Sequence, residues 1–209
     1  NGLSGFDQYY SDPNKPVPYL DKVTTRRPGT EHQYMVEDQR FASTRPDVLV
    51  YQTPPLAHDL TIAGPITATL YASTTGTDAD FIVKVIDVYP HNTPDPTPNP
   101  TQVVLGGYQQ LLRGEVMPAR FRKGFEKGVA MVPNQVEKVE FELPDVLHTF
   151  KAGHRVMVQV QSSWFPLVDR NPQTFVDIYR ATASDYRPAW MRIHRAPGRE
   201  SRITLGVLR

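Results

Sequence analysis

Cysteine is absent from all 209 residues. Its absence excludes disulfide bonds, thiol catalysis and zinc sites with cysteine ligands, but it does not identify the compartment. The 23 Lys and Arg residues nearly balance the 22 Asp and Glu residues, so nothing indicates nucleic acid or an anionic membrane as a partner. No hydrophobic run is long enough to cross a bilayer. No signal peptide is visible at Asn1, so we expect a mature form or an excised piece.

The motifs that carry common enzyme chemistry are also missing. Gly2-Leu3-Ser4-Gly5 has the wrong spacing for a serine-hydrolase nucleophile elbow, and no strand precedes it. Gly106-Gly107 lacks the Lys-Ser/Thr pair and the helix of a phosphate-binding loop. The six histidines show no short or helical ligand spacing, so we expect no metal site and no cofactor.

Short alternating strands separated by turns dominate the remaining pattern, with 20 prolines and 13 glycines. No segment has a convincing helical stripe, and this favours an all-β, antiparallel β-sandwich with a Greek-key or jelly-roll path. We expect an irregular, extended lead-in over residues 1–46 and the sandwich over residues 47–209. The predicted strands are residues 48–51, 66–72, 81–90, 103–112, 115–121, 136–143, 156–161, 189–194 and 203–208.

Aromatic residues suggest two parts of a binding surface. Trp164 and Phe165 follow the end of the alternating strand 156–161, before Pro166. They form either a hydrophobic corner or the wall of a ligand or sugar site. The lead-in carries further rings and lies against this domain or a neighbouring one. Because neither group suits complete burial in one sandwich, we expect both at an interface; the candidates are Trp164, Phe165, Tyr9, Tyr10 and Tyr19.

Several polar residues are predicted to be structural. Asp78 and Asp80 could help to hold calcium, but a turn in which they accept backbone N–H bonds is the favoured interpretation. Asp87 interrupts an apolar strand, and a buried carboxylate needs a partner. We therefore expect Asp87 to pair with an arginine: Arg120, Arg122 or Arg155. His154 is predicted to be a structural hydrogen-bonding residue, and Asp169-Arg170 to close a polar turn.

Several motifs together resemble the C-terminal domain of the cocaine esterase/X-Pro dipeptidyl-peptidase (CocE/NonD, S15-like) serine hydrolases. The strand end Gln161-Ser-Ser-Trp-Phe-Pro166 and the turn Asp169-Arg-Asn-Pro-Gln173 carry the resemblance. Asp38-Gln-Arg-Phe41, Gly76-Thr-Asp-Ala-Asp-Phe81 and Gly106-Gly-Tyr-Gln109 also match. The combination is similar to the α-amino-acid ester hydrolase and glutaryl-cephalosporin acylase branch, over nearly the whole chain.

The resemblance implies a galactose-binding-like jelly roll beside an α/β-hydrolase domain that carries the Ser-His-Asp triad. No triad motif matches this chain, so the resemblance implies that no catalytic residue lies here. It implies instead that this domain supports the catalytic domain, the substrate cleft and assembly. The expected partner is that catalytic domain; homo-oligomerisation stays open, and the family favours a periplasmic or secreted location. The alternative function is a free-standing carbohydrate- or ligand-binding module.

Overall fold

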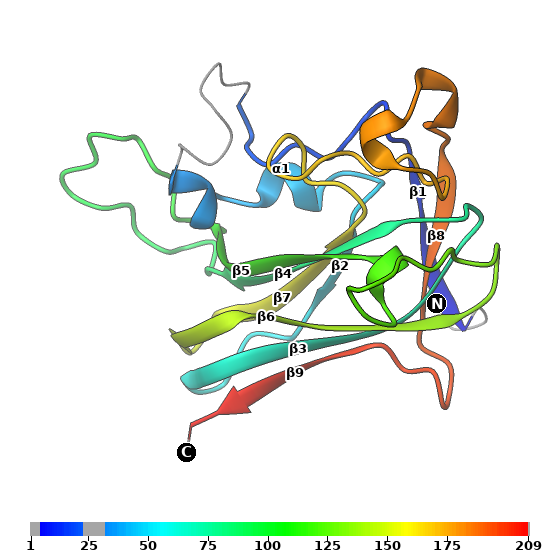
Figure 1. Ribbon diagram of the computed structural model, residues 1–209. Coiled ribbons are helices and arrows are strands. Elements are labelled where there is room, and N and C mark those ends of the chain that lie inside the picture. Colours follow the sequence, from blue (N-terminus) through cyan, green and yellow to red (C-terminus); the bar gives the residue numbers. More distant parts are fainter. Residues whose placement is uncertain (1–4, 23–31, 209) are drawn as a thin grey trace.

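The computed structural model describes residues 5–22 and 32–208, and these residues form two antiparallel sheets packed face to face (Figure 1). In the first sheet β1 (Phe6–Ser11), β8 (Ala189–His194), β3 (Leu60–Thr74) and β6 (Glu137–Phe150) lie in that order, and β9 (Arg202–Val207) also pairs with β3. The second sheet has the order β2 (Leu49–Gln52), β7 (Arg155–Gln161), β4 (Asp80–Val88) and β5 (Gln109–Pro118). The predicted antiparallel sandwich is confirmed.

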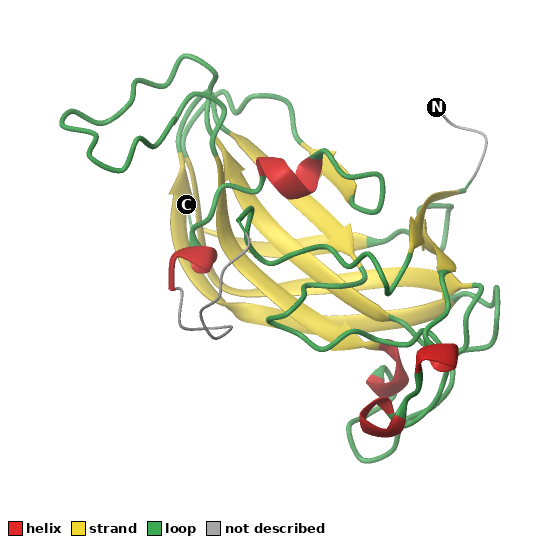
Figure 2. Ribbon diagram, turned by 90° about the horizontal axis from the view of Figure 1, so that it is seen from above, coloured by secondary structure: helices red, strands yellow, loops and turns green. Residues whose placement is uncertain are grey.

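Within residues 5–22 and 32–208, helical structure is limited to single turns, as Figure 2 shows. Among the described residues no helix is long and apolar enough to cross a membrane. The turns are η1 (His32–Met35), α1 (Arg40–Ser43), η2 (Ala119–Phe121), η3 (Ile178–Arg180) and η4 (Ala183–Asp185).

Strand β4 explains why the fold has two hydrophobic layers. It is buried along almost its whole length, because each of its faces is covered. Phe81, Val83 and Val85 point between the two sheets into the main core. Ile82 and Ile86 point the other way, into a second cluster with Tyr19 and Trp164. A strand that is covered on both sides reads as a nearly continuous apolar run, and from Phe81 to Val88 only Lys84 and Asp87 interrupt it.

Two predicted elements differ from the structure. Phe6–Ser11 was expected to be irregular, but it forms β1 and pairs with β8 over six residues. This pairing joins segments about 180 residues apart, which local pattern alone does not report. Residues 103–112 and 115–121 were expected to be two strands, yet a single strand, β5, runs through Gly114. A Cβ at Gly114 would lie 2.9 Å from the Trp164 ring, so a glycine here admits the ring and does not end the strand.

The sandwich has two distinct ends. The β3–β4 turn, the end of β7 and the start of β8 share one end, since Asp80 pairs with Pro118, Ile82 with Gln161 and Thr74 with Met191. Val88 at the other end of β4 pairs with Gln109 and Arg155, beside the long loop of residues 91–108.

Candidate functional site

Exposed aromatic side chains gather at one end of the sandwich. Seven large aromatic side chains of the described residues are exposed, and six lie around the β3–β4 turn: Tyr10, Phe125, Phe165, Phe175, Tyr179 and Trp190. Trp190 is the second residue of β8, and its carbonyl accepts a hydrogen bond from Thr75 N of that turn. The Tyr10 ring packs on the Trp190 ring with a centroid distance of 5.2 Å. We call these six residues the aromatic end. Surface aromatics are normally scattered, so a concentration of this kind indicates an interaction site.

The long connection between β7 and β8 supplies three of the six rings. Residues 162–188 contain no strand and only the turns η3 and η4, which lie above β8 in Figure 1. Connections this long without regular structure are uncommon unless they have a function. Tyr179 in η3 is 84% exposed, so its ring is held out into solvent.

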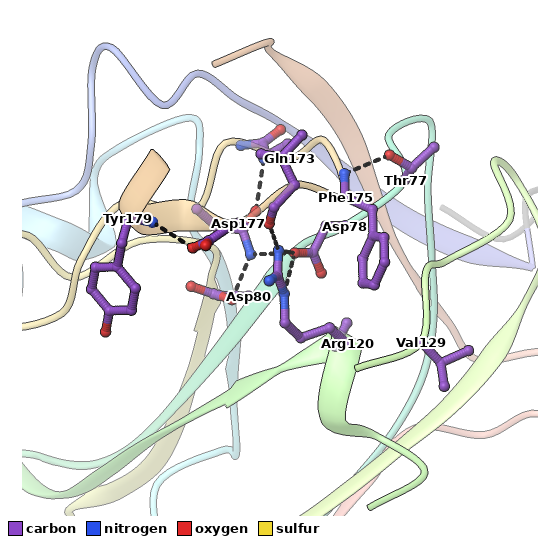
Figure 3. Close-up of polar contacts among 12 residues, drawn as sticks. Thr77, Asp78, Asp80, Arg120, Val129, Gln173, Phe175, Asp177 and Tyr179 are labelled. Atoms are coloured by element: carbon purple, nitrogen blue, oxygen red, sulfur yellow. Dashed lines mark hydrogen bonds and ion pairs between the residues drawn. The ribbon is translucent and has the colours of Figure 1, made fainter. Parts of the chain in front are cut away.

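A buried polar network fixes this connection to the β3–β4 turn (Figure 3). Asp78 is fully buried, and its Oδ2 accepts from Arg120 Nε at 2.8 Å and from Asn171 Nδ2 at 3.2 Å. Asn171 Nδ2 also donates to Asp80 Oδ1 at 2.8 Å, so one amide bridges both carboxylates. Arg120 Nη2 donates to the Val176 carbonyl at 2.9 Å. Both aspartates therefore accept hydrogen bonds from side chains outside the turn, Arg120 and Asn171, instead of from the backbone N–H groups that were predicted.

Backbone contacts tighten the same junction. The Gln173 carbonyl accepts from Thr77 N, and Phe175 N donates to Thr77 Oγ1 at 2.8 Å. A Cβ at Gly76 would lie only 2.4 Å from the Gln173 carbonyl oxygen, so glycine is required for this approach. Gln173 Nε2 donates to Ser11 Oγ at 2.7 Å and connects the junction to β1. Backbone and side-chain hydrogen bonds therefore attach the connection beneath the aromatic end to the β3–β4 turn and to β1.

Burial raises the pKa of one carboxyl group in this network, that of Asp80. Desolvation raises the pKa of Asp80 to about 7, and the nearby Asp78 charge raises it further against the opposing effect of the Asn171 hydrogen bond. Asp78 forms the ion pair with Arg120. Asp80, which is bound by the neutral Asn171 amide, is therefore the carboxyl group of this network with a pKa near neutrality.

A small hollow of about 190 Å³ lies between Phe165, Tyr179 and Tyr186 at the aromatic end. The Arg170 guanidinium stacks 5.6 Å from the Phe165 ring and 4.9 Å from the Tyr186 ring, and its Nη1 donates to the Pro13 carbonyl. The neighbouring Asp169 is exposed. Arg170 therefore links the Phe165 and Tyr186 rings to the lead-in at Pro13, and the turn predicted at Asp169-Arg170 is not present, since neither residue lies in a turn.

Three of the five expected interface aromatics are buried within this chain, which corrects the prediction for them. Tyr9 and Tyr19 are 1% and 2% exposed, and Trp164 is 6% exposed. The Tyr9 hydroxyl forms a hydrogen bond with Ser162 Oγ at 2.7 Å, and desolvation raises the pKa of Tyr9. Lead-in residues 17–19 cover the Trp164 side of the sheet, since Phe165 N donates to the Val17 carbonyl. Of the five expected interface aromatics, only Phe165 and Tyr10 are exposed.

Trp164 covers a buried lysine that the sequence analysis missed. Lys84 of β4 is fully buried, with its Nζ 4.9 Å from the Trp164 ring centroid and 2.9 Å from Gln39 Oε1. Desolvation lowers the pKa of Lys84 to about 7. Gln159, its partner on β7, has a buried Oε1 with no protein partner among the described residues. A lysine in an apolar strand is the same signal that identified Asp87, and it could have been found.

Asp87 is buried as expected, but its partners are histidines and not an arginine. Its Oδ1 lies 2.8 Å from His154 Nδ1, and its Oδ2 lies 2.9 Å from His148 Nε2. Arg155 instead donates to the Thr53 carbonyl. His148 comes from β6 in the other sheet, so the carboxylate joins the two sheets. His154 is a structural hydrogen-bonding residue, as predicted.

The described residues contain no arrangement suited to nucleophilic catalysis or metal binding. Ser73 Oγ lies 3.0 Å from His194 Nε2, yet Ser73 is 1% exposed and no carboxylate contacts His194 in the described part of the chain. Burial and the nearby Arg199 and Arg192 lower the pKa of His194. No group of three His, Asp or Glu side chains within residues 5–22 and 32–208 could hold a metal ion.

Known proteins resemble this chain over nearly its whole length. Residues 6–204 match the family described as the X-Pro dipeptidyl-peptidase C-terminal non-catalytic domain. Cocaine esterase of Rhodococcus sp. (strain MB1 Bresler) is 30% identical over 209 residues, which are all of this chain and 33% of that protein.

Two solved structures are closely similar. An aminopeptidase from the marine sediment archaeon Thaumarchaeota archaeon superposes with a TM-score of 0.90 at 46% identity, covering 98% of this chain and 33% of that one. An α-amino acid ester hydrolase superposes with a TM-score of 0.88 at 42% identity, covering 99% of this chain and 33% of that one. The chain thus spans about a third of the length of these relatives. It belongs to the X-Pro dipeptidyl-peptidase C-terminal non-catalytic domain family.

Proposed function

We propose that this chain is the non-catalytic β-sandwich domain of a serine hydrolase and supports an α/β-hydrolase domain of the same polypeptide. The family match over residues 6–204 is the observation that carries the proposal. In the parent enzyme, acyl transfer would proceed through a serine nucleophile and a histidine base that belong to the catalytic domain.

The site chemistry supports a supporting role. The strongly perturbed groups, Asp80 and Lys84, are buried and occupied by structural contacts. The surface at the aromatic end offers apolar and stacking contacts but no nucleophile with a base. Such a domain can wall a substrate cleft and stabilise its neighbour, while the specificity pocket lies mostly elsewhere.

A carbohydrate-binding module is the alternative, since jelly rolls also serve as lectins. The family match does not favour it. Arg170 lines the hollow beside Phe165 and Tyr179, and its guanidinium already stacks on the Phe165 ring, which leaves little flat aromatic surface for a sugar ring.

Hydrolase assays on two proteins test the proposal. The 209-residue chain should give background rates with p-nitrophenyl esters, ampicillin and an X-Pro anilide. The complete gene product should hydrolyse at least one of these compounds. Turnover by the 209-residue chain that survives repurification and disappears on a single substitution in it would contradict a non-catalytic role. A complete gene product without any hydrolase activity would contradict the supporting role.

A further inference from the structure

The aromatic end is the part of the molecule best suited to contact a partner. Six of seven exposed large aromatic side chains of the described residues lie there, and their exposed fractions run from 39% to 84%. A fully exposed aromatic side chain offers about 150–250 Å², so six rings together offer roughly 600 Å² of apolar surface. One side of a typical interface between domains is of this size.

We propose that the aromatic end is the docking surface for the catalytic domain of the same polypeptide. This inference rests on the proposed function and adds to it the place of contact. Interfaces are rich in Tyr, Trp, Phe and Arg at their centre. The aromatic end supplies this chemistry through Tyr179, Trp190 and the Arg170 guanidinium, which stacks on Phe165 and Tyr186. The loop of residues 91–108 at the other end carries none of the six rings.

A buried hydrogen-bond network beneath it distinguishes this surface from an ordinary loop. The connection of residues 162–188 is fixed by Asp78, Arg120 and Asn171, which lie beneath it and out of contact with solvent or nearly so. Ordering side chains on binding costs free energy, and a surface that is already ordered avoids that cost. A buried network of this kind is costly for a loop that serves no contact, but it is suited to hold docking residues in place.

Chain length favours the catalytic domain over a second copy as the occupant. The matched relatives have about two thirds of their length outside the region that this chain covers. A domain tethered in the same polypeptide has an effective concentration in the millimolar range, far above that of free copies. It therefore occupies an apolar surface of this size ahead of another molecule.

Charge substitutions at two docking residues test the inference. Tyr179→Glu and Trp190→Glu place a carboxylate in the aromatic end, and Leu147→Glu is the matched control, since Leu147 is 75% exposed on β6 at the opposite end. Each variant is made in the 209-residue chain and in the complete gene product. All three should leave the melting temperature of the 209-residue chain within about 3 °C, because the changed side chains are exposed.

In the complete gene product, Tyr179→Glu and Trp190→Glu should speed proteolytic release of this domain at least fivefold and separate one melting transition into two. Leu147→Glu should change neither property. Wild-type rates and a single transition for both aromatic-end variants, in a wild-type enzyme that is active, would overturn the docking surface and leave the proposed function intact. An inactive wild type would overturn both, because no catalytic domain would remain to dock.

Discussion

Replacing Lys84 with methionine should stabilise the domain at neutral pH, although the substitution removes a hydrogen bond. The amine is fully buried, and desolvation is the cause that lowers its pKa from 10.5 to about 7. The difference of 3.5 units corresponds to a ceiling of about 5 kcal/mol, at about 1.36 kcal/mol per unit. Methionine leaves Gln39 Oε1 without its donor, which costs about 1–3 kcal/mol. Lys84→Met should therefore raise the free energy of unfolding at pH 7, by at most about 2–4 kcal/mol.

The direction of the pH dependence gives the sharper test. The folded-state pKa of Lys84 lies below its unfolded value, so the unfolded chain binds more protons between about pH 7 and 10.5. The wild-type free energy of unfolding should consequently rise with pH through this window, and the penalty of burying the amine is complete at pH 7 and below. At pH 10 only about 1 kcal/mol of the penalty remains, so the advantage of methionine should vanish or reverse.

Urea denaturation of the 209-residue chain at pH 7 and pH 10 measures both effects. Lys127→Met, at an exposed lysine, is the matched control and should differ from wild type by the same amount at both pH values. A Lys84→Met variant that is less stable than wild type at pH 7, with a difference that does not change with pH, would refute the reasoning. It would mean that the ammonium is solvated or paired inside the fold.

Three further substitutions test the other buried contacts. Asp80→Asn should make the free energy of unfolding less dependent on pH between about pH 4 and 7. The folded pKa of Asp80, about 7, lies above the unfolded value of 3.8, so the wild-type free energy of unfolding falls as pH rises through this window. Urea denaturation at pH 4 and pH 7 measures the difference. Asp87→Ala should lose about 2–5 kcal/mol because two imidazoles lose their acceptor, whereas exposed Asp169→Ala should lose under about 0.5; equal losses would place Asp87 in water. Trp164→Ala should cost the 209-residue chain about 3–5 kcal/mol, and a thermal melt unchanged within error would restore Trp164 to the surface.

Local pattern predicted the elements better than it predicted their partners. The alternation of Val156, Val158 and Val160 predicted β7, and the acid within an apolar strand predicted the burial of Asp87. The partner of Asp87 could not be predicted, because His148 arrives from β6 in the opposite sheet, 61 residues away in sequence. Arginine is a common partner for a buried carboxylate, but the strand arrangement places His148 and His154 beside Asp87.

The site was predicted in part for the same reason. Trp164 and Phe165 are neighbours in sequence, yet one is enclosed and the other is 39% exposed. The difference depends on Tyr19 and Lys84, which the fold brings to Trp164 from distant segments. Asn171 and Gln173 belong to a motif that the sequence analysis had singled out, but their contacts with Asp78 and Ser11 appear only in three dimensions.

Hydrogen exchange is the most direct test of docking through the aromatic end. Backbone amides would be compared between the 209-residue chain and the complete gene product, under identical conditions, with mass spectrometry as the readout. The account predicts slower exchange in the complete gene product over residues 165–190 and around Phe125, and unchanged exchange in the loop of residues 91–108 at the opposite end. Protection confined to residues 91–108 and the neighbouring end of β6, with residues 165–190 exchanging equally in both proteins, would contradict it.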